Sequence, residues 1–198
     1  RIAVRFFGGY NLSSIDLNSE YLVSQAYQKG VTMGSDLLHN DNKIPEFLVW
    51  AQRDKNGAPL QRIQIIKGWI DNNSGRPKEK VYDVACSDGM QPDPTTNRCP
   101  DNGARVNIND CSISTNVGSS ELKTVWKDPE FAPDDKTFYY VRVLENPTCR
   151  WSTWDAIKAG YKPREGLHET IQERAWSSPI WYIPCLLYTS PSPRDKRL

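Results

Sequence analysis

Histidine is the side chain that most often serves as a catalytic base or a metal ligand, and the chain has only two, His39 and His168. Asp36 and His39 are three residues apart, a spacing that can bring two metal ligands together on one turn. They run directly into residues 40–42, an Asn-Asp-Asn sequence typical of a solvated loop. His168 lies in a polar connector, and no motif places a serine or cysteine nucleophile beside it. We therefore predict no catalytic residue and no metal-binding residue in this chain.

Oxygen ligands suited to calcium are concentrated in residues 86–118, a segment rich in Asp, Asn, Pro, Gly and Ser. The order of these residues does not match the acidic loop pattern that fixes a known calcium geometry. Asp and Asn also form turns, because their side chains accept hydrogen bonds from nearby backbone N–H groups. We interpret the cluster as turn-forming; its members are Asp88, Asp93, Asp101, Asn102, Asn107 and Asp110.

Four of the five cysteines lie in or beside predicted loops, three of them within 86–118: Cys86, Cys99, Cys111 and Cys149. Their spacing contains no Cys-x-x-Cys and no nearby histidine pair, so disulfides are favoured over zinc. Four cysteines allow three connectivities, among which the sequence does not choose. We favour Cys86 with Cys99, which closes the segment locally, and Cys111 with Cys149, which links the far end of the segment to the strand predicted at 137–144. Because disulfides persist in oxidising compartments, we predict a periplasmic or extracellular location.

The seven tryptophans could line a carbohydrate-binding platform. Trp50 and Trp126 lie within strand patterns and are predicted to be core residues. Arg150, Trp151 and Trp154 follow a strand end in a connector, so they are the candidate contact with another domain or a ligand. For both connector tryptophans, however, we favour packing onto the sheet over such a contact.

The composition excludes several classes of protein. The 25 Lys and Arg residues nearly balance the 24 Asp and Glu residues, so no extended basic field exists for nucleic acid or an anionic membrane surface. No apolar run of about 18 residues is present, so we predict no membrane span. The chain begins at Arg1 without an initiator Met or a signal segment, so we expect either a removed leader or a piece of a longer protein.

Strand patterns dominate the chain, and no strands alternate with long helices, which excludes a complete α/β barrel. In residues 60–69, Ile63 and Ile65 alternate with Arg62 and Gln64, the pattern of a half-buried sheet. About seven strands separated by turns predict a mainly β fold, an antiparallel immunoglobulin-like β-sandwich with short helices and one long irregular disulfide-bearing loop at 86–118. The predicted strands are 1–7, 46–52, 60–69, 80–85, 121–126, 137–144 and 173–182; the predicted helices are 19–28, ending at Gly30, and 153–159; the predicted turns include 54–57, 72–75 and 128–134.

The C-terminal residues differ from the rest of the chain. From Cys185 onward the sequence is polar and Pro-spaced and shows neither strand nor helix periodicity. Residues 185–195 resemble the translation of a sequencing-library adapter, so we predict that 185–198 is a non-native tail and that 1–184 is the native domain. The alternative is an ordinary disordered C-terminal tail.

Several sequence blocks, taken in order, resemble one bacterial family. The early blocks are 5–9 (RFFGG), 30–37 (GVTMGSDL), 47–51 (FLVWA), 62–69 (RIQIIKGW) and 80–85 (KVYDVA). The later blocks are 124–131 (TVWKDPEF), 138–145 (FYYVRVLE) and 171–182 (IQERAWSSPIWY). Together they resemble the domain-of-unknown-function 3604 (DUF3604) group over residues 1–184. That group is similar to the metal-dependent hydrolases of the polymerase-and-histidinol-phosphatase superfamily.

The resemblance implies that a metal-binding catalytic barrel lies before Arg1 and that this chain is the C-terminal β-sandwich that follows it. A divalent metal is then expected in the missing catalytic domain, with no cofactor in this fragment. Residues 34–36 are Gly-Ser-Asp where the family usually has Gly-Gly-Asp, so Asp36 receives no role. The cysteine-containing segment resembles only one subset of the family, which favours local stabilisation over catalysis.

The leading functional hypothesis is an accessory sandwich that buttresses the catalytic domain of an exported metal-dependent hydrolase acting on phosphoesters or other esters. The upstream catalytic domain is its expected partner. The alternative is an independent glycan-binding β-sandwich that uses its tryptophans, and a third hypothesis is a sandwich that mediates oligomer contacts. The sequence identifies neither the substrate, nor the metal, nor the oligomeric state.

Overall fold

The computed structural model describes residues 1–40, 43–71 and 74–185 of the 198-residue chain. The predicted loop at 40–42 and the predicted turn at 72–75 lie partly outside the described residues. The predicted adapter-derived tail lies outside them except for Cys185, which is exposed and forms no disulfide with a described residue.

Strands make up most of the regular structure, as the alternating patterns predicted. The described helices are α1 (Leu22–Lys29), α2 (Trp151–Lys158) and the short 3-10 helix η1 (Leu12–Ser14), and none of them is long and apolar enough to cross a membrane. The strands are β1 (Ala3–Gly9), β2 (Gly30–Thr32), β3 (Asp36–Leu38), β4 (Glu46–Gln52), β5 (Leu60–Ile70), β6 (Pro77–Cys86), β7 (Glu121–Lys127), β8 (Thr137–Glu145), β9 (Thr148–Cys149), β10 (Thr170–Ile171), β11 (Arg174–Trp176) and β12 (Ile180–Ile183).

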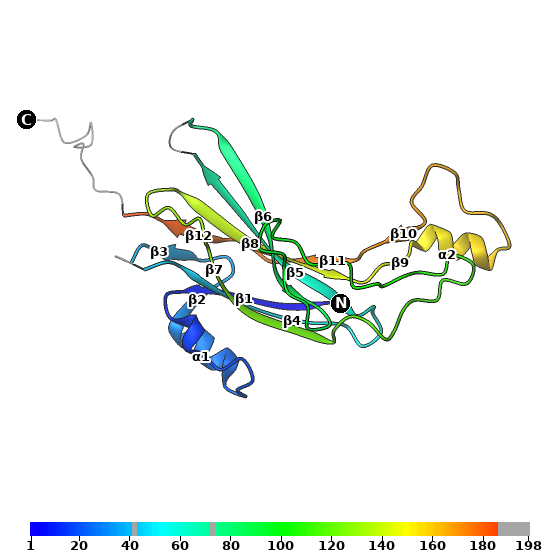
Figure 1. Cartoon of the computed structure of the whole chain (residues 1–198), viewed down its shortest axis with the longest axis horizontal. Helices are drawn as coiled ribbons and strands as arrows, with labels where there is room; N and C mark the ends of the chain where they lie inside the picture. Colours follow the sequence, from blue (N-terminus) through cyan, green and yellow to red (C-terminus); the bar gives the residue numbers. More distant parts are fainter. Residues whose placement is uncertain (41–42, 72–73, 186–198) are drawn as a thin grey trace, which may run out of the picture.

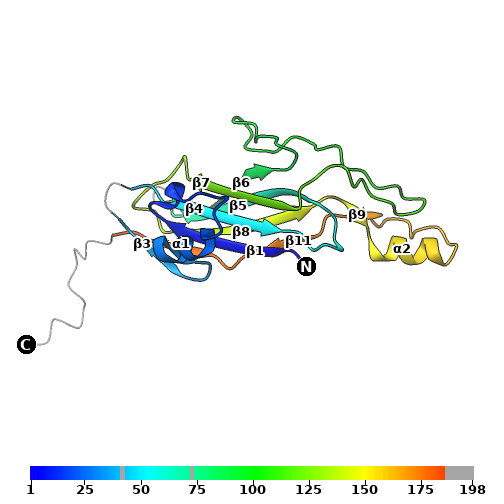
Figure 2. The same cartoon turned by 90° about the horizontal axis from the view of Figure 1, so that it is seen from below.

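Two sheets pack face to face, so the predicted β-sandwich is confirmed (Figure 1, Figure 2). The four-stranded sheet has the order β2-β1-β4-β7, and the six-stranded sheet has the order β3-β12-β8-β5-β6, with β11 also paired to β8. Pairing is antiparallel except between β3 and β12, which run parallel. The small β9-β10 ladder and α2 project from one end of the sandwich (Figure 1).

The four-stranded sheet is buried on both faces. Phe6 and Phe47 point into the core between the sheets, whereas their neighbours Phe7 and Leu48 point to the opposite face. That opposite face is covered by η1 and α1, which contributes the buried Leu22 (Figure 1). Successive side chains on a strand point to opposite faces of the sheet. Because both faces are covered at these positions, two consecutive residues are both apolar, whereas a sheet covered on one face would have one polar residue of the two.

Gly30 follows α1 but does not act as the left-handed cap that a helix-terminating glycine usually provides. It is extended, with φ −152° and ψ 179°, and it is already the first residue of β2. A Cβ at this position would lie 2.5 Å from the carbonyl oxygen of Gly8 on β1. The glycine is therefore needed for the close approach of two strands.

The predicted last strand, 173–182, is wrong as a single element. It is divided into β11 and β12, which both pair with β8, by residues 177–179. The hydroxyl of Ser177 accepts a hydrogen bond from the backbone N–H of Val141 (2.9 Å), and Pro179 cannot donate to a ladder. Because of this break, β11 and β12 each pair with a different part of β8.

The half-buried pattern predicted for 60–69 is only partly right. Ile63 and Ile65 point into the core as predicted, but Gln64 on the opposite face is also buried, with 2% of its surface exposed. Gln64 donates a hydrogen bond from Nε2 to Asp83 Oδ1 (2.6 Å), and the backbone N–H of Cys99 donates to Asp83 Oδ2 (2.7 Å). The irregular segment therefore covers the outer face of β5 and β6 at this point, which strand alternation alone does not reveal.

A buried ion pair closes one end of the core. The Nζ of Lys67 lies 2.6 Å from Asp128 Oδ2, and both side chains are almost completely buried. The hydroxyl of Tyr139 donates to the same carboxylate oxygen (2.7 Å), and Lys67 also donates to the carbonyl of Glu130 (2.7 Å). Burial, together with the negative charge of Asp128, raises the pKa of Tyr139, so its hydroxyl remains a donor. These contacts hold the turn after β7 against the core.

We predict that Asp128→Ala lowers the free energy of unfolding by about 3–5 kcal/mol, because it leaves the Lys67 ammonium buried without its counter-ion. Replacing both partners by apolar residues, as Lys67→Met with Asp128→Leu, should recover much of that loss. Urea unfolding of the three proteins measures the differences.

The matched control is Asp101→Ala, which removes the exposed ion pair with Arg105. Exposed pairs contribute little to stability, so its urea midpoint should stay close to that of the unmodified chain. An Asp128→Ala midpoint no lower than that of Asp101→Ala would show that the buried pair does not anchor the turn.

Candidate functional site

Two disulfides fix the irregular segment to the sandwich. Cys86 is bonded to Cys99 and Cys111 to Cys149, the pairing that the sequence favoured. The first bond attaches the segment to the end of β6, and the second attaches it to β9 beside α2. The segment is therefore held at two places, although it contains no long helix or strand.

The acidic and amide residues of this segment serve as turn acceptors, as predicted. The Oδ1 atom of Asp93, for example, accepts from the backbone N–H groups of Thr95 (2.9 Å) and Thr96 (2.7 Å). Within the described residues, no group of three or more His, Cys, Asp or Glu side chains is placed to hold a metal ion. Asp101, Asn102, Asn107 and Asp110 likewise accept from the backbone N–H groups two residues further on, those of Gly103, Ala104, Asn109 and Ser112. Asp88 differs, because it accepts from the backbone N–H of the distant Gly118, so its side chain closes no local turn.

The structure does not bring the two histidines into one constellation. The Nδ1 of His39 lies 2.7 Å from the hydroxyl of Tyr182, which in turn donates to the carbonyl of Pro133 (2.9 Å). Burial raises the pKa of that hydroxyl to about 12, so it stays protonated at neutral pH. His168 is exposed and lines a separate cleft described below.

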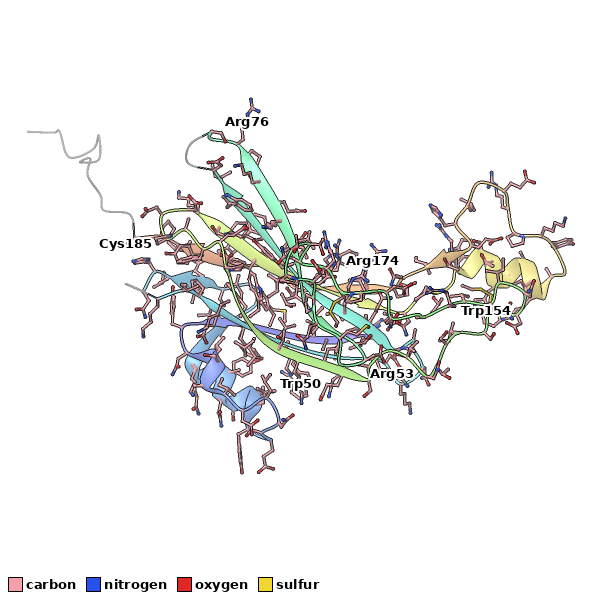
Figure 3. The ribbon with its side chains drawn as sticks, in the orientation of Figure 1. Trp50, Arg53, Arg76, Trp154, Arg174 and Cys185 are labelled. Carbon is pink, nitrogen blue, oxygen red and sulfur yellow. A yellow bond between two sulfur atoms is a disulfide. The ribbon has the colours of Figure 1, made fainter. Side chains whose placement is uncertain are left out.

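The predicted contact residues Arg150, Trp151 and Trp154 lie at the α2 end of the molecule, where Figure 3 labels Trp154. Arg150 precedes the helix, and its backbone N–H donates to the carbonyl of Glu169 (2.9 Å). The side chains of Trp151 and Trp154 are 72% and 40% exposed, so neither is packed onto a sheet. The Nζ of Lys158 lies 5.2 Å from the centre of the Trp154 ring. Their role in binding stays a prediction.

The two tryptophans predicted to be core residues have different surroundings. Trp126 packs against the core between the sheets, with its ring centre 5.0 Å from that of Tyr82. Trp50 lies on the other face of the four-stranded sheet, partly exposed, and its Nε1 donates to Glu121 Oε2 (2.7 Å). The prediction is therefore right for Trp126 and wrong for Trp50, because Trp50 points away from the core between the sheets.

An apolar hollow lies on the uncovered outer face of the six-stranded sheet, where β5, β8 and β12 meet. It has a volume of about 510 Å³. The ring of Phe138 lies across Gly68, where an added Cβ would come within 2.3 Å of the ring. Trp181 stands beside Phe138 at a centre-to-centre distance of 5.1 Å and is 46% exposed. We call this hollow the aromatic groove; its apolar lining includes Gly68, Trp69, Ile70, Phe138, Trp181 and Ile183.

Sequence reasoning missed the aromatic groove. The block around Trp181 was predicted to be one strand, so nothing indicated which face Trp181 would occupy. The one signal was Gly68 within an otherwise apolar strand pattern, because glycine in a strand often marks a close approach of another group. A second hollow, at the opposite end of β5, contains Arg150 and His168 and is markedly basic.

The fold and these surfaces define a disulfide-linked β-sandwich domain. Residues 1–184 match the family described as a protein of unknown function (DUF3604), so the chain belongs to that family. The match covers all the strands of the sandwich and ends where the strand patterns end. Searches of curated proteins and of solved structures gave no significant match.

We predict that the two disulfides stabilise the fold unequally. Their cysteines are 13 and 38 residues apart, so loop entropy gives about 3 kcal/mol for the Cys86–Cys99 bond and about 4 kcal/mol for the Cys111–Cys149 bond. Paired Cys→Ser substitutions measured by urea unfolding should follow this order. Cys185→Ser is the control and should leave the midpoint unchanged. A larger loss on removing the shorter loop would contradict the prediction.

Proposed function

We propose that this chain is the accessory, non-catalytic β-sandwich of an exported metal-dependent hydrolase, and that its partner is a catalytic domain encoded upstream in the same protein. The observation that carries the proposal is the aromatic groove. Trp181, Ile70 and Ile183 leave between 38% and 46% of their surfaces exposed around one apolar hollow. A contiguous apolar surface of this kind is typical of a face that packs against another domain.

The remaining parts of the proposal rest on the sequence and on chemistry. The resemblance of the family to metal-dependent hydrolases supports a reaction on phosphoester or other ester bonds, with a divalent metal held in the upstream domain. Two disulfides in a domain of this size favour an oxidising compartment, the bacterial periplasm or the extracellular space. In this arrangement the sandwich buttresses the catalytic domain through its outer face.

Glycan binding is the second candidate function, because exposed aromatic rings are the main apolar surface to which sugars bind. The geometry of the groove gives it less support than it gives domain docking. The planes of Phe138 and Trp181 are inclined by 48°, whereas a flat sugar platform needs rings that face the same way. The surface that the groove exposes is mainly apolar, although Lys78, Glu79 and Lys136 also line it, and bound sugars need several hydrogen bonds.

The chain alone should not hydrolyse esters, because the proposed catalytic domain is not part of it. The assay is turnover of p-nitrophenyl phosphate and p-nitrophenyl acetate by the purified chain with added Mn²⁺ or Zn²⁺. We expect rates equal to those of a heat-denatured control, and clear turnover would overturn the proposal. Sequencing the gene upstream of the Arg1 codon supplies the second test. We expect an open reading frame that encodes His- and Asp-rich strand ends, and its absence would contradict the proposed upstream catalytic domain.

A titration of tryptophan fluorescence with a panel of oligosaccharides separates docking from glycan binding. The proposal predicts no saturable change. A saturable change that Trp181→Ser abolishes and Trp151→Ser preserves would replace docking by glycan binding at the groove. Trp151 is the matched control because it is exposed on α2, away from the groove.

A further inference from the structure

A basic cleft of about 690 Å³ lies between the irregular segment and the β9-β10 end of the molecule. Arg174, labelled in Figure 3, lies between the body of the sandwich and the α2 end. The cleft is lined by five basic side chains and one acidic side chain: Arg62, Arg105, Arg150, His168 and Arg174, with Asp101. This concentration of one sign of charge is notable in a chain whose formal net charge is only +1.

The positive charge of the cleft is only partly neutralised within the described residues. Arg105 is paired with Asp101, from its Nη2 to Oδ2 at 2.7 Å. Arg62 shares the carboxylate of Asp83 with Arg98, at 3.6 and 3.4 Å. Two guanidinium groups, of which Arg62 lines the cleft, thus share one carboxylate.

The other two arginines of the cleft have no carboxylate partner in the described part of the chain. Arg150 makes no ion pair there, and Arg174 lies over the ring of Trp176 at 5.8 Å and donates from Nε to the carbonyl of Gln172 (3.2 Å). Arg174 also lines a neighbouring hollow, which contains the side chains of Asp54, Glu145 and Glu173. Both arginines therefore line the cleft without an ion pair to a carboxylate among the described residues.

The guanidinium of Arg62, which lines the cleft, is incompletely compensated. Its Nε is buried and has no hydrogen-bond partner among the described residues, since its distance to Asp83 exceeds a hydrogen bond. Burial, followed by the repulsion of Arg98 and Arg142, lowers the pKa of Arg62, and Asp83 offsets this only in part. A bound anion in the cleft would offset the repulsion among these arginines.

The floor of the cleft is organised before any ligand binds. The Oε1 of Gln61 accepts hydrogen bonds from Arg62 and from Gln172 (2.9 Å), and Gln61 donates from Nε2 to Asn102 (3.2 Å). Cys99, which is bonded to Cys86, forms part of the wall. A preorganised site loses less conformational entropy when a ligand binds.

We propose that this cleft binds a small oxyanion, in the form of a phosphate, sulfate or carboxylate group of a ligand, between Arg150 and Arg174 above Arg62. Guanidinium groups bind such groups through paired, charge-assisted hydrogen bonds. The hydroxyl of Thr170 lines the cleft beside them and supplies a neutral hydrogen-bond donor. This inference does not depend on the proposed docking of the aromatic groove, which lies at the other end of β5.

The test is isothermal titration calorimetry of the chain with inorganic phosphate, inorganic sulfate and citrate, each at an ionic strength fixed with sodium chloride. We expect saturable binding of one equivalent of at least one anion, and the preferred anion identifies the ligand group. Arg150→Gln and Arg174→Gln should each weaken binding by about tenfold, the effect of losing one charge-assisted hydrogen bond.

Arg76→Gln is the matched control, because Arg76 is an exposed arginine on the β5-β6 hairpin, distant from the cleft (Figure 3). It should bind as the unmodified chain does, and circular dichroism should show that all three variants are folded. Absence of saturable binding to all three anions would overturn the proposal. So would equal weakening by Arg76→Gln, because that would mean a general charge effect and no site.

Discussion

The buried carboxylate of Asp83 is the constraint on which the irregular half of the molecule depends. It accepts hydrogen bonds from Gln64 on the adjacent strand and from the backbone of Cys99, and it pairs with Arg62 and Arg98. A carboxylate taken out of water needs such partners, because an unpaired charge is costly to bury. The contacts that satisfy Asp83 are the same contacts that hold the segment after Cys86 against the sheet. The basic cleft exists because the segment is held there.

The outer faces of the two sheets are covered differently, and this difference accounts for the basic cleft and the aromatic groove. The four-stranded sheet is covered by η1 and α1, so its second face forms a small core of its own. The six-stranded sheet is covered at one end by the disulfide-linked segment and is left open at the other. Its covered end forms the basic cleft, and its open end forms the aromatic groove. One strand, β5, runs beneath both.

Local sequence patterns predicted the sandwich and most of its long strands, because these follow from alternation and turn residues. The observed disulfide pairing was the one favoured among three that the sequence left open. They did not predict what depends on contacts between distant segments. Gln64 has the sequence position of a solvent-facing residue, yet it is buried because a loop about 35 residues further on covers it. Nothing in the sequence around Lys67 or Asp128 distinguishes either residue from an exposed charge. They form an ion pair because the turn between β7 and β8 packs against β5. Arg62, Arg150 and Arg174 come from three separate elements, so no spacing along the chain indicated a shared cleft.

Hydrogen–deuterium exchange of the Asp83→Asn variant tests most directly whether this one carboxylate organises the irregular segment and the cleft. The substitution preserves the size of the side chain and removes the charge that Arg62 and Arg98 share. We expect faster exchange confined to residues 87–118, with β1, β4 and β8 exchanging as in the unmodified chain. Unchanged exchange in that segment, or a uniform increase through all the strands, would contradict the account.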